Sequence, residues 1–336
     1  MPEPVAPDVV RALSTVLAPL GRLQGLERLT GGMFATTYRA HLDDGSRVVV
    51  KTAPTATERL LTYELDLLRT EAEVYRLAAD RPDLLMPAVL LTDLSRTELP
   101  TDVLVASHLD GIPLIDAGEL PPPVADAVQR QLGGLMARLH TVHGDHFGYP
   151  NRATGLHAPT WPEAFSRMVS ALLDDARRWG TPLPEDEIRA ALLRHASALA
   201  EVRTPSLVHT DLWAGNLFVD PSSGALTGVI DTERSVWGDP LLELVGADQT
   251  GRGPVPAALL EGYAEAGGFL PLGTPSGDAR LLLYRLSMAL VLLVEIGPRG
   301  YVGDWVDAHR ATAEGNLRAA LDALGGRGPG TDAPGR

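Results

Sequence analysis

The sequence contains no cysteine, and this absence removes several classes of chemistry. Disulfide bonds, thiolate nucleophiles and zinc sites with cysteine ligands are all excluded. The absence is consistent with a reducing environment, so we expect a cytoplasmic protein. With 45% apolar residues among 336, the chain can still form one large domain, or two lobes with separate cores.

Basic residues are few relative to acidic ones. The chain carries 29 lysines and arginines against 43 aspartates and glutamates, which gives a formal net charge of -14. Nucleic-acid-binding proteins need basic surfaces that meet the phosphate backbone, so this balance argues against nucleic acid as a partner. It is compatible with a cationic substrate, and also with an acidic surface that only maintains solubility.

Long uninterrupted apolar segments are lacking as well. Residues 1–20 have neither the basic start nor the apolar core of a secretory signal. The longest apolar stretch, residues 281–297, is interrupted by Arg285 and Glu295. Because a bilayer-spanning helix needs about 20 consecutive apolar residues, we expect this stretch to form a buried helix and the protein not to bind a membrane.

The secondary-structure signals change along the chain. The first third contains short strand-like runs separated by turn residues, whereas the remainder is mostly helical in its periodicity, apart from one small hairpin. This order predicts an α+β fold with a β-rich N-terminal part. The predicted strands lie at residues 26–30, 36–40, 47–51, 103–106, 217–220 and 226–230, and the main predicted helices at 58–79, 125–140, 161–178 and 185–199.

Three polar residues around the second hairpin carry the strongest chemical signal. Asp211 and Asn216 lie in a turn-rich segment before one strand, and Asp231 ends the next strand. Because a hairpin brings its two ends together, Asn216 and Asp231 can face one point, and their hard oxygen ligands suit Mg²⁺. Asp211 remains as a carboxylate that can accept a hydroxyl proton in phosphoryl transfer.

The motifs around these residues resemble those of the aminoglycoside phosphotransferase and choline/fructosamine kinase group, which are relatives of protein kinases. In chain order the motifs are His209-Thr210-Asp211, Gly215-Asn216, Ile230-Asp231 and Gly238-Asp239-Pro240. The resemblance implies a protein-kinase-like two-lobed fold, with Asp211 as catalytic base and with Asn216 and Asp231 as Mg²⁺ ligands. It also implies that His209 braces the catalytic loop and that Asp239 orders a loop.

A few positions depart from the usual pattern of this group. Thr210 stands where glycine is common, and Glu243 stands where an aspartate is usual after Gly-Asp-Pro. Thr232 and Glu233 follow Asp231 where other residues are frequent. No catalytic group is lost through these changes. Because of Thr210, however, the motif does not indicate to which subfamily of the group the catalytic loop belongs.

The N-terminal third contains the nucleotide-binding parts that the resemblance implies. Gly31 and Gly32, between two predicted strands, look like the loop that covers the nucleotide, because glycines let backbone N–H groups approach phosphates. Lys51 ends the run Val-Val-Val-Lys, where a lysine can reach the α- and β-phosphates while it pairs with a helix glutamate. Glu71 matches that glutamate best; the alternatives are Glu73 and Glu64.

The resemblance also predicts where the lobes divide. We expect a nucleotide-binding lobe at residues 1–106, a hinge at 107–111, a catalytic and acceptor-binding lobe at 112–325 and a disordered tail at 326–336. The backbone around Ser107 and Leu109 would then bind the edge of the adenine ring.

Some polar and aromatic residues can be assigned either to an acceptor pocket or to packing. Aromatic and acidic side chains suit an amino-sugar, which makes Glu233, Trp237 and Glu295 candidates for a substrate pocket. Packing or surface placement is the alternative for each of them. His140, His143 and His146 are spaced by three residues, but a helix C-terminus explains such residues better than a metal site does.

These features predict Mg²⁺-dependent transfer of the γ-phosphoryl group of ATP to a hydroxyl of a small molecule, with an aminoglycoside or other amino-sugar as the favoured acceptor. A fructosamine-like or choline-like acceptor stays open. A protein kinase is disfavoured, because Asp231 is not followed by Phe-Gly and no Ala-Pro-Glu segment is present. A non-catalytic nucleotide-binding module is disfavoured, because every expected catalytic group is present.

Overall fold

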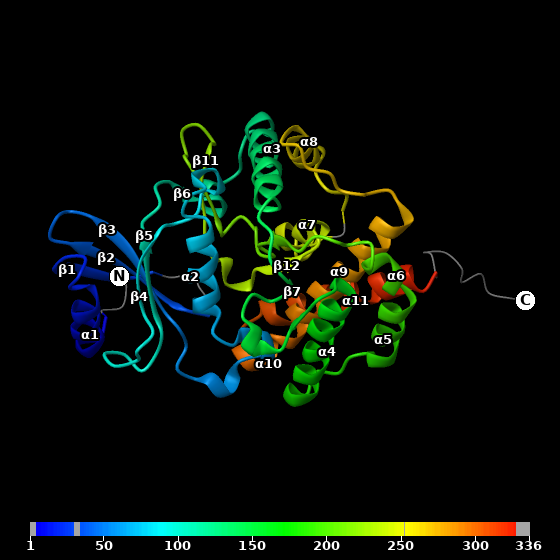
Figure 1. Cartoon of the computed structure of the whole chain (residues 1–336), viewed down its shortest axis with the longest axis horizontal. Coiled ribbons are helices and arrows are strands. Elements are labelled where there is room, and N and C mark those ends of the chain that lie inside the picture. The colour runs from blue at the N-terminus through cyan, green and yellow to red at the C-terminus, as the bar shows by residue number, and fades with distance from the viewer. Residues whose placement is uncertain (1–4, 30–33, 252, 327–336) are drawn as a thin grey trace, which may run out of the picture. The chain divides into compact units, whose positions relative to one another are not determined.

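The structure is a computed structural model that describes residues 5–29, 34–251 and 253–326. It is a mixed α+β chain, which confirms the predicted class, with antiparallel strands in the N-terminal part and helices dominating the C-terminal part (Figure 1). The chain divides into two compact units, neither of them contiguous. Unit 1 is Met1–Leu60, Asp66–Val128 and Ala214–Ser235, and unit 2 is Leu61–Leu65, Gln129–Trp213 and Val236–Arg336.

This division differs from the contiguous lobes predicted from the sequence. The second hairpin belongs to unit 1 because its strand β10 (Leu217–Val219) pairs with β6 (Ile112–Pro113). The segment Leu61–Leu65 belongs to unit 2, where the backbone N–H of Thr62 donates to Asp175 at 2.7 Å. Both assignments depend on contacts between distant segments, which periodicity does not reveal. The predicted tail beyond Gly326 lies outside the described residues.

Unit 1 is built on a five-stranded antiparallel sheet in the order β1-β2-β3-β5-β4. A second, smaller sheet has the order β11-β10-β6. The remaining strands of this unit are β1 (Leu23–Arg28), β2 (Thr36–Leu42), β3 (Arg47–Thr52), β4 (Val89–Asp93), β5 (Val103–Ser107) and β11 (Leu226–Val229), and its helices are α1 (Pro7–Leu17) and α2 (Leu67–Leu77). Helix α3 (Pro122–Leu139) starts in unit 1 and continues in unit 2.

Strand β5 supplies core residues to both faces of the larger sheet, because successive side chains of a strand point in opposite directions. Val103 and Val105 belong to the core cluster that contains α1 residues. Leu104 and Ala106 belong to a second cluster, with α2. Lys51 of β3 lies directly opposite Leu104 in the β3–β5 register, so its side chain shares the face covered by α2.

Unit 2 combines a small antiparallel sheet with most of the helices. The sheet has the order β8-β7-β12-β9. Its strands are β7 (Phe147–Gly148), β8 (His157–Ala158), β9 (Ser206–Val208) and β12 (Val236–Gly238). The helices are α4 (Trp161–Trp179), α5 (Glu185–Arg194), α6 (Ala196–Leu199), α7 (Leu241–Ala247), α8 (Ala257–Glu265), α9 (Pro275–Val294), α10 (Ile296–Arg299) and α11 (Trp305–Leu324).

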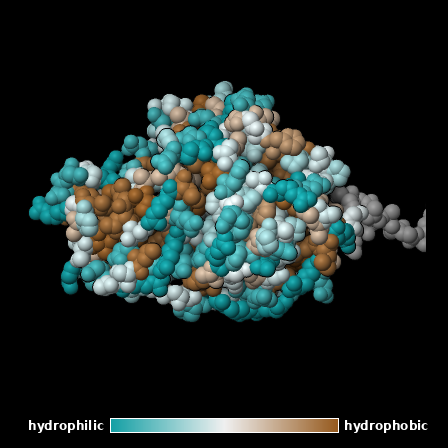
Figure 2. Space-filling view, viewed as in Figure 1, coloured by the Kyte–Doolittle hydropathy of each residue, from teal (hydrophilic) through white to brown (hydrophobic). Residues whose placement is uncertain are grey.

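Helix α9 is the long apolar helix predicted from the sequence. The segment Pro275–Arg299 is long enough, and its most apolar window apolar enough, to cross a membrane, so Arg285 and Glu295 do not by themselves exclude a span, contrary to the expectation from the sequence. Within the protein, however, 72% of its most apolar window is buried, where α9 packs against α4, α7 and α11. On the face drawn in Figure 2, hydrophilic side chains cover much of the surface and apolar ones gather in separate patches.

Candidate active site

Lys51 lies at the centre of a buried charge cluster in unit 1. Its ammonium group donates to Glu71 Oε1 at 2.6 Å and to Asp231 Oδ1 at 2.5 Å, and only 8% of the residue is exposed. Burial opposes the charge, but the carboxylates of Asp231 and Glu71 outweigh it and raise the pKa of Lys51 well above its usual value. Lys51 is therefore a permanent cation, held in place by two carboxylates.

Glu71 reaches Lys51 because it lies on the side of α2 that packs against the sheet. It is fully buried, and it also accepts a hydrogen bond of 2.6 Å from the Tyr75 hydroxyl, one helical turn further on. The same hydroxyl accepts from the backbone N–H of Asp231 at 3.1 Å. Of the two alternatives, Glu73 is exposed and Glu64 pairs with an arginine within unit 2. Sequence reasoning missed Tyr75, although its i+4 spacing from Glu71 was visible.

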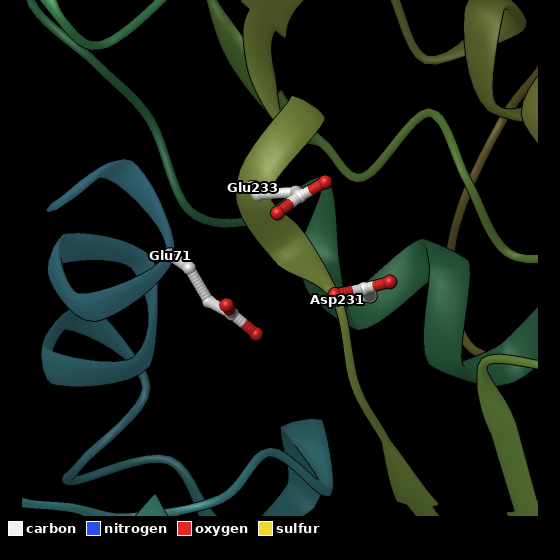
Figure 3. A group of neighbouring side chains, drawn as sticks. All are labelled: Glu71, Asp231 and Glu233. Atoms are coloured by element: carbon white, nitrogen blue, oxygen red, sulfur yellow. The ribbon is translucent and has the colours of Figure 1, made fainter. Parts of the chain in front are cut away.

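Asp231 follows strand β11 in a left-handed backbone conformation, with φ of 70°. Residues other than glycine rarely adopt this conformation, and those that do gather at functional sites. The turn Thr232–Arg234 comes next and packs against α2. Figure 3 shows the result: Glu71 extends from α2 toward Asp231 and Glu233, and ligand atoms of the three carboxyl groups lie within 4.8 Å of one another.

Glu233 is a second deeply buried acid of this cluster, beside Glu71. It is 5% exposed, and its Oε2 has no hydrogen-bond partner among the described residues. Burial, reinforced by the negative charge of Asp231, raises the pKa of Glu233 well above its usual value. The carboxyl group of Glu233 therefore holds its proton more strongly than that of an exposed glutamate, and it lies in the part of the site that the sequence assigns to nucleotide and Mg²⁺.

The burial of Glu233, Trp237 and Glu295 bears on the two alternatives that the sequence left open for them, an acceptor pocket or packing. Trp237 is 5% exposed, and its ring packs so closely on Gly144 that a Cβ there would lie 2.4 Å away. Glu295 is 3% exposed and accepts a 2.5 Å hydrogen bond from the Tyr63 hydroxyl. All three side chains are buried, so the structure favours the packing alternative.

Asn216 and Asp231 lie at the same end of the β10–β11 hairpin, where the sequence predicts them. Leu217 is paired with Val229, and the Asn216 carbonyl accepts from the Ile230 N–H at 3.0 Å. Asn216 is 5% exposed. An amide oxygen and a carboxylate at one hairpin end match the hard donor set that Mg²⁺ prefers, so the residues present fit this ion.

The predicted hinge residues are held by the sheet and by β11. The Ser107 N–H donates to the Ala88 carbonyl at 2.9 Å, so this N–H is already used within unit 1. The Leu109 side chain packs against Gly228, where an added Cβ would lie 2.4 Å from it. The predicted nucleotide-covering glycines, Gly31 and Gly32, lie outside the described residues.

Asp211 lies in unit 2, in the loop after β9. Two backbone groups of this loop are bound by Glu243 of α7: Oε2 accepts the His209 N–H at 2.7 Å, and Oε1 accepts the Thr210 N–H at 2.9 Å. The His209 ring is fully buried, and its Nδ1 accepts the Asp211 N–H at 3.3 Å. His209 therefore contacts the loop backbone, and Glu243 fastens the loop to α7.

Thr210 has a left-handed backbone, with φ of 67°. This conformation explains why glycine is common there, since a β-branched residue is strained in it. Gly246 of α7 lies against the same segment, and a Cβ on it would be 2.5 Å from the Thr210 carbonyl carbon. The close approach of α7 and the two hydrogen bonds to Glu243 together hold the strained residue.

Glu243 is supported in turn by two residues that sequence reasoning did not connect with it. His140 Nε2 lies 3.6 Å from Glu243 Oε2, and His140 Nδ1 shares a 2.8 Å hydrogen bond with the Tyr263 hydroxyl. Burial, together with the charge of Glu243, raises the pKa of Tyr263. His140 is thus a structural residue. Among the described residues, the one group of three or more His, Asp or Glu side chains close enough to share an ion is Glu71, Asp231 and Glu233, and the Lys51 ammonium already pairs with two of them.

Asp239 orders the segment after β12. Its Oδ2 accepts from Arg280 Nη1 and from the Tyr284 hydroxyl, both at 2.7 Å. Trp161 is fully buried and donates to the same tyrosine at 2.7 Å. These contacts hold Asp239 against α9, which agrees with the ordering role that the resemblance implies.

Comparison with known proteins identifies the fold. Residues 25–281 match the sequence profile described as "Phosphotransferase enzyme family". A protein from Thermobifida fusca YX-ER1, provisionally named fructosamine-3-kinase, is 21% identical with a TM-score of 0.66, over 95% of this chain and 99% of that one.

Two further structures are similar and carry bound ligands. A thermostable mutant of aminoglycoside phosphotransferase APH(4)-Ia with ADP and hygromycin B is 20% identical, with a TM-score of 0.60, over 94% of this chain and 98% of that one. APH(2")-IIia with GDP and kanamycin is 17% identical, with a TM-score of 0.62, over 93% and 98%. At these identities the structures establish the kinase-like fold.

Proposed function

Since the chain belongs to the phosphotransferase enzyme family and is an ATP-dependent small-molecule kinase, we propose that it transfers the γ-phosphoryl group to a hydroxyl of an amine-bearing small molecule, with Mg²⁺. The observation that carries the proposal is the buried cluster in which Lys51 pairs with both Glu71 and Asp231. It places a fixed cation beside a carboxylate at the hairpin end that also carries Asn216.

Each group has a defined part in the proposed reaction. Lys51 binds phosphate oxygens and is oriented by Glu71. Asn216 and Asp231 hold Mg²⁺, which when bound neutralises charge on the transferred phosphoryl group. The acceptor hydroxyl loses its proton to Asp211 as its oxygen bonds to the γ-phosphorus, and the bond from that phosphorus to the bridging oxygen of ADP breaks.

The two sets of residues are linked by a short stretch of chain. Asp211 belongs to unit 2 and Asn216 to unit 1. Five residue steps keep their Cα atoms within about 18 Å of each other in any conformation. This covalent tether supports a division of labour in which unit 1 binds the nucleotide and unit 2 supplies the base and the acceptor site.

The acceptor class is the finer part of the proposal. A net charge of -14 favours a cationic acceptor by long-range attraction. Two similar structures contain the aminoglycosides hygromycin B and kanamycin, which supports an amino-sugar. A fructosamine-like acceptor is the second candidate, favoured by the Asp-Leu-Trp-x-Gly-Asn form at 211–216 and by the likeness to the Thermobifida fusca protein.

The first experiment measures Mg²⁺-dependent ATP and GTP consumption with aminoglycosides, other amino-sugars, fructosamines, choline-like alcohols and a generic protein. Turnover with one small-molecule class supports the proposal and selects the acceptor. Asp211→Asn should retain nucleotide binding and lose turnover by a factor of roughly 10² to 10⁴, the range typical of a general base. Near-normal turnover of this variant would refute Asp211 as the base.

The Mg²⁺ site has its own test. Asp231→Asn should weaken MgATP binding and raise the Mg²⁺ concentration needed for half-maximal turnover, because one anionic ligand is lost. Asp220→Asn is the control, since Asp220 caps the turn of the same hairpin through Ser222. An unchanged Mg²⁺ requirement in Asp231→Asn would contradict the assigned role.

A further inference from the structure

Gln249 contacts the side chain on which the proposed chemistry depends: its Nε2 donates a hydrogen bond to Asp211 Oδ1. We propose that Gln249 is a positioning residue, which holds the Asp211 carboxylate in the orientation that accepts the proton of the incoming hydroxyl. This inference rests on the proposed function, in which Asp211 is the base. Neither the sequence motifs nor the family resemblance pointed to Gln249.

The position of Gln249 follows from the way α7 ends. The helix stops at Ala247, and Asp248 leaves the helical conformation with φ of -139° and ψ of 73°. Asp248 Oδ1 then accepts the Gly251 N–H at 3.0 Å, which closes a tight turn around residues 249 and 250. Helix α7 therefore fastens the catalytic loop through Glu243 near its start and presents Gln249 to the same loop just beyond its end.

The turn itself is anchored by two long helices of unit 2. Asn316 of α11, which is 7% exposed, donates from Nδ2 to the Thr250 carbonyl at 3.0 Å. Arg285 of α9 donates to the carbonyl of Gly251. Burial lowers the pKa of Arg285, although Asp248 partly offsets this effect. Arg285 and Asn316 thus each donate a hydrogen bond to a backbone carbonyl of the turn. These two bonds hold the turn, and with it Gln249, against α9 and α11.

The chemistry of an amide suits this position. A carboxamide donates a hydrogen bond without carrying charge or competing for the proton, and it uses one of about four lone-pair positions of a carboxylate. A base held in one orientation reacts faster than one that rotates, because alignment is part of the barrier. Loss of the hydrogen bond that orients a metal ligand typically costs 10-fold to 100-fold in affinity or activity, and we expect a loss of about the lower end of this range for an oriented base.

Two substitutions separate the hydrogen bond from the bulk of the side chain. Gln249→Met keeps the length and removes the donor, whereas Gln249→Glu keeps the shape and places a negative charge against Asp211. Gln24→Met is the matched control, because Gln24 is an exposed glutamine on β1. The probe is MgATP with the best acceptor from the panel, or with water alone if hydrolysis is the one measurable turnover, since water is deprotonated at the same position.

We expect Gln249→Met to lower kcat about 10-fold and Gln249→Glu to lower it further, with the KM for ATP unchanged in both. Gln24→Met should keep the wild-type kcat. Wild-type kcat in Gln249→Met, or a loss that appears as a higher KM for ATP instead, would overturn the inference. Turnover by Asp211→Asn distinguishes failure of the positioning role of Gln249 from failure of the proposed base. If Asp211→Asn is inactive while Gln249→Met is normal, the positioning role alone is wrong; if Asp211→Asn is active, the proposed base is wrong.

Discussion

The carboxylate of Glu243 accepts the backbone N–H of His209 at 2.7 Å, and this is one of two hydrogen bonds that fasten the loop carrying Asp211 to α7. Glu243→Gln replaces one acceptor oxygen with an NH₂ group, which cannot accept the second N–H. A buried donor left unpaired costs about 1–3 kcal/mol, so the free energy of unfolding should fall by that amount and kcat should fall with it. Urea unfolding and steady-state kinetics measure both quantities.

The control for this prediction is Glu243→Asp, which keeps both acceptor oxygens and restores the residue usual in the family. It should lose less stability than Glu243→Gln. Equal stability of the glutamine variant and the wild type would mean that the two hydrogen bonds do not hold the loop.

The strained backbone of Thr210 predicts a substitution that does not lower the free energy of unfolding, unlike Glu243→Gln. A left-handed conformation costs a residue with a Cβ about 1–2 kcal/mol, whereas glycine adopts it freely. Glycine also gains about 0.5–1 kcal/mol of entropy in the unfolded chain, so Thr210→Gly should be neutral or slightly stabilising. Thr204→Gly, at an exposed position without a left-handed backbone, should be destabilised. A clear loss of stability in Thr210→Gly would show that the threonine side chain stabilises the loop.

The Lys51 cluster predicts a large effect that depends on pH. Lys51→Met leaves the carboxyl groups of Glu71 and Asp231 without their cation, and breaking a buried ion pair costs about 3–5 kcal/mol. The decrease in the free energy of unfolding, measured by urea unfolding, should be smaller at pH 5.5 than at pH 7.5. At the lower pH the carboxylates that have lost their cation can take up protons. Glu71→Gln should lower the free energy of unfolding less than Lys51→Met does, because the ion pair between Lys51 and Asp231 remains. Equal losses at both pH values would argue against uncompensated carboxylates as the cause.

Asp175 of α4 predicts a pH-dependent stability that is independent of catalysis. Burial raises the pKa of this carboxyl group, although Thr62 donates to it from its N–H and its hydroxyl. The folded chain therefore keeps the proton at pH values where the unfolded chain, with a pKa of about 3.9, has lost it. As pH rises from about 3.9 through the higher pKa of the folded state, the contribution of Asp175 to the free energy of unfolding decreases.

Asp175→Asn removes this titration while keeping an acceptor for Thr62. The stability of the variant relative to wild type should therefore improve as pH rises from acid to neutral, as urea unfolding at several pH values can measure. The neighbouring Asp174→Asn is the control, because Asp174 is exposed and pairs with Arg177. The same trend in both variants would exclude burial of Asp175 as the cause.

Local sequence signals predicted the parts of the site that short-range geometry determines. The turn between two β-like runs placed Asn216 and Asp231 at one hairpin end, and the run ending in Lys51 became strand β3. The helix predicted at 58–79 was too long, because Asp66 is left-handed with φ of 56° and α2 starts after it. Strand β4 was not predicted.

Long-range contacts account for the residues that the sequence did not reveal. The roles of Tyr75, His140 and Tyr263 depend on which helix faces which, and the contact between Gln249 and Asp211 depends on where α7 ends. The burial of Trp237 and Glu295 likewise comes from neighbours far away in sequence. Chemical type left both a binding pocket and packing open for these residues, and only the folded structure shows that they are buried.

Strand β5 has a consequence for how such an enzyme can diverge. Its odd-numbered core residues face α1 and its even-numbered ones face α2, on the side that carries Lys51. Substitutions at Val103 or Val105 can be compensated within the α1 cluster, whereas changes at Leu104 or Ala106 alter the packing on the face that carries Lys51. Substitutions can therefore accumulate on the α1 face of β5 while the α2 face stays constrained. Changes on the α1 face can alter stability with little effect on turnover.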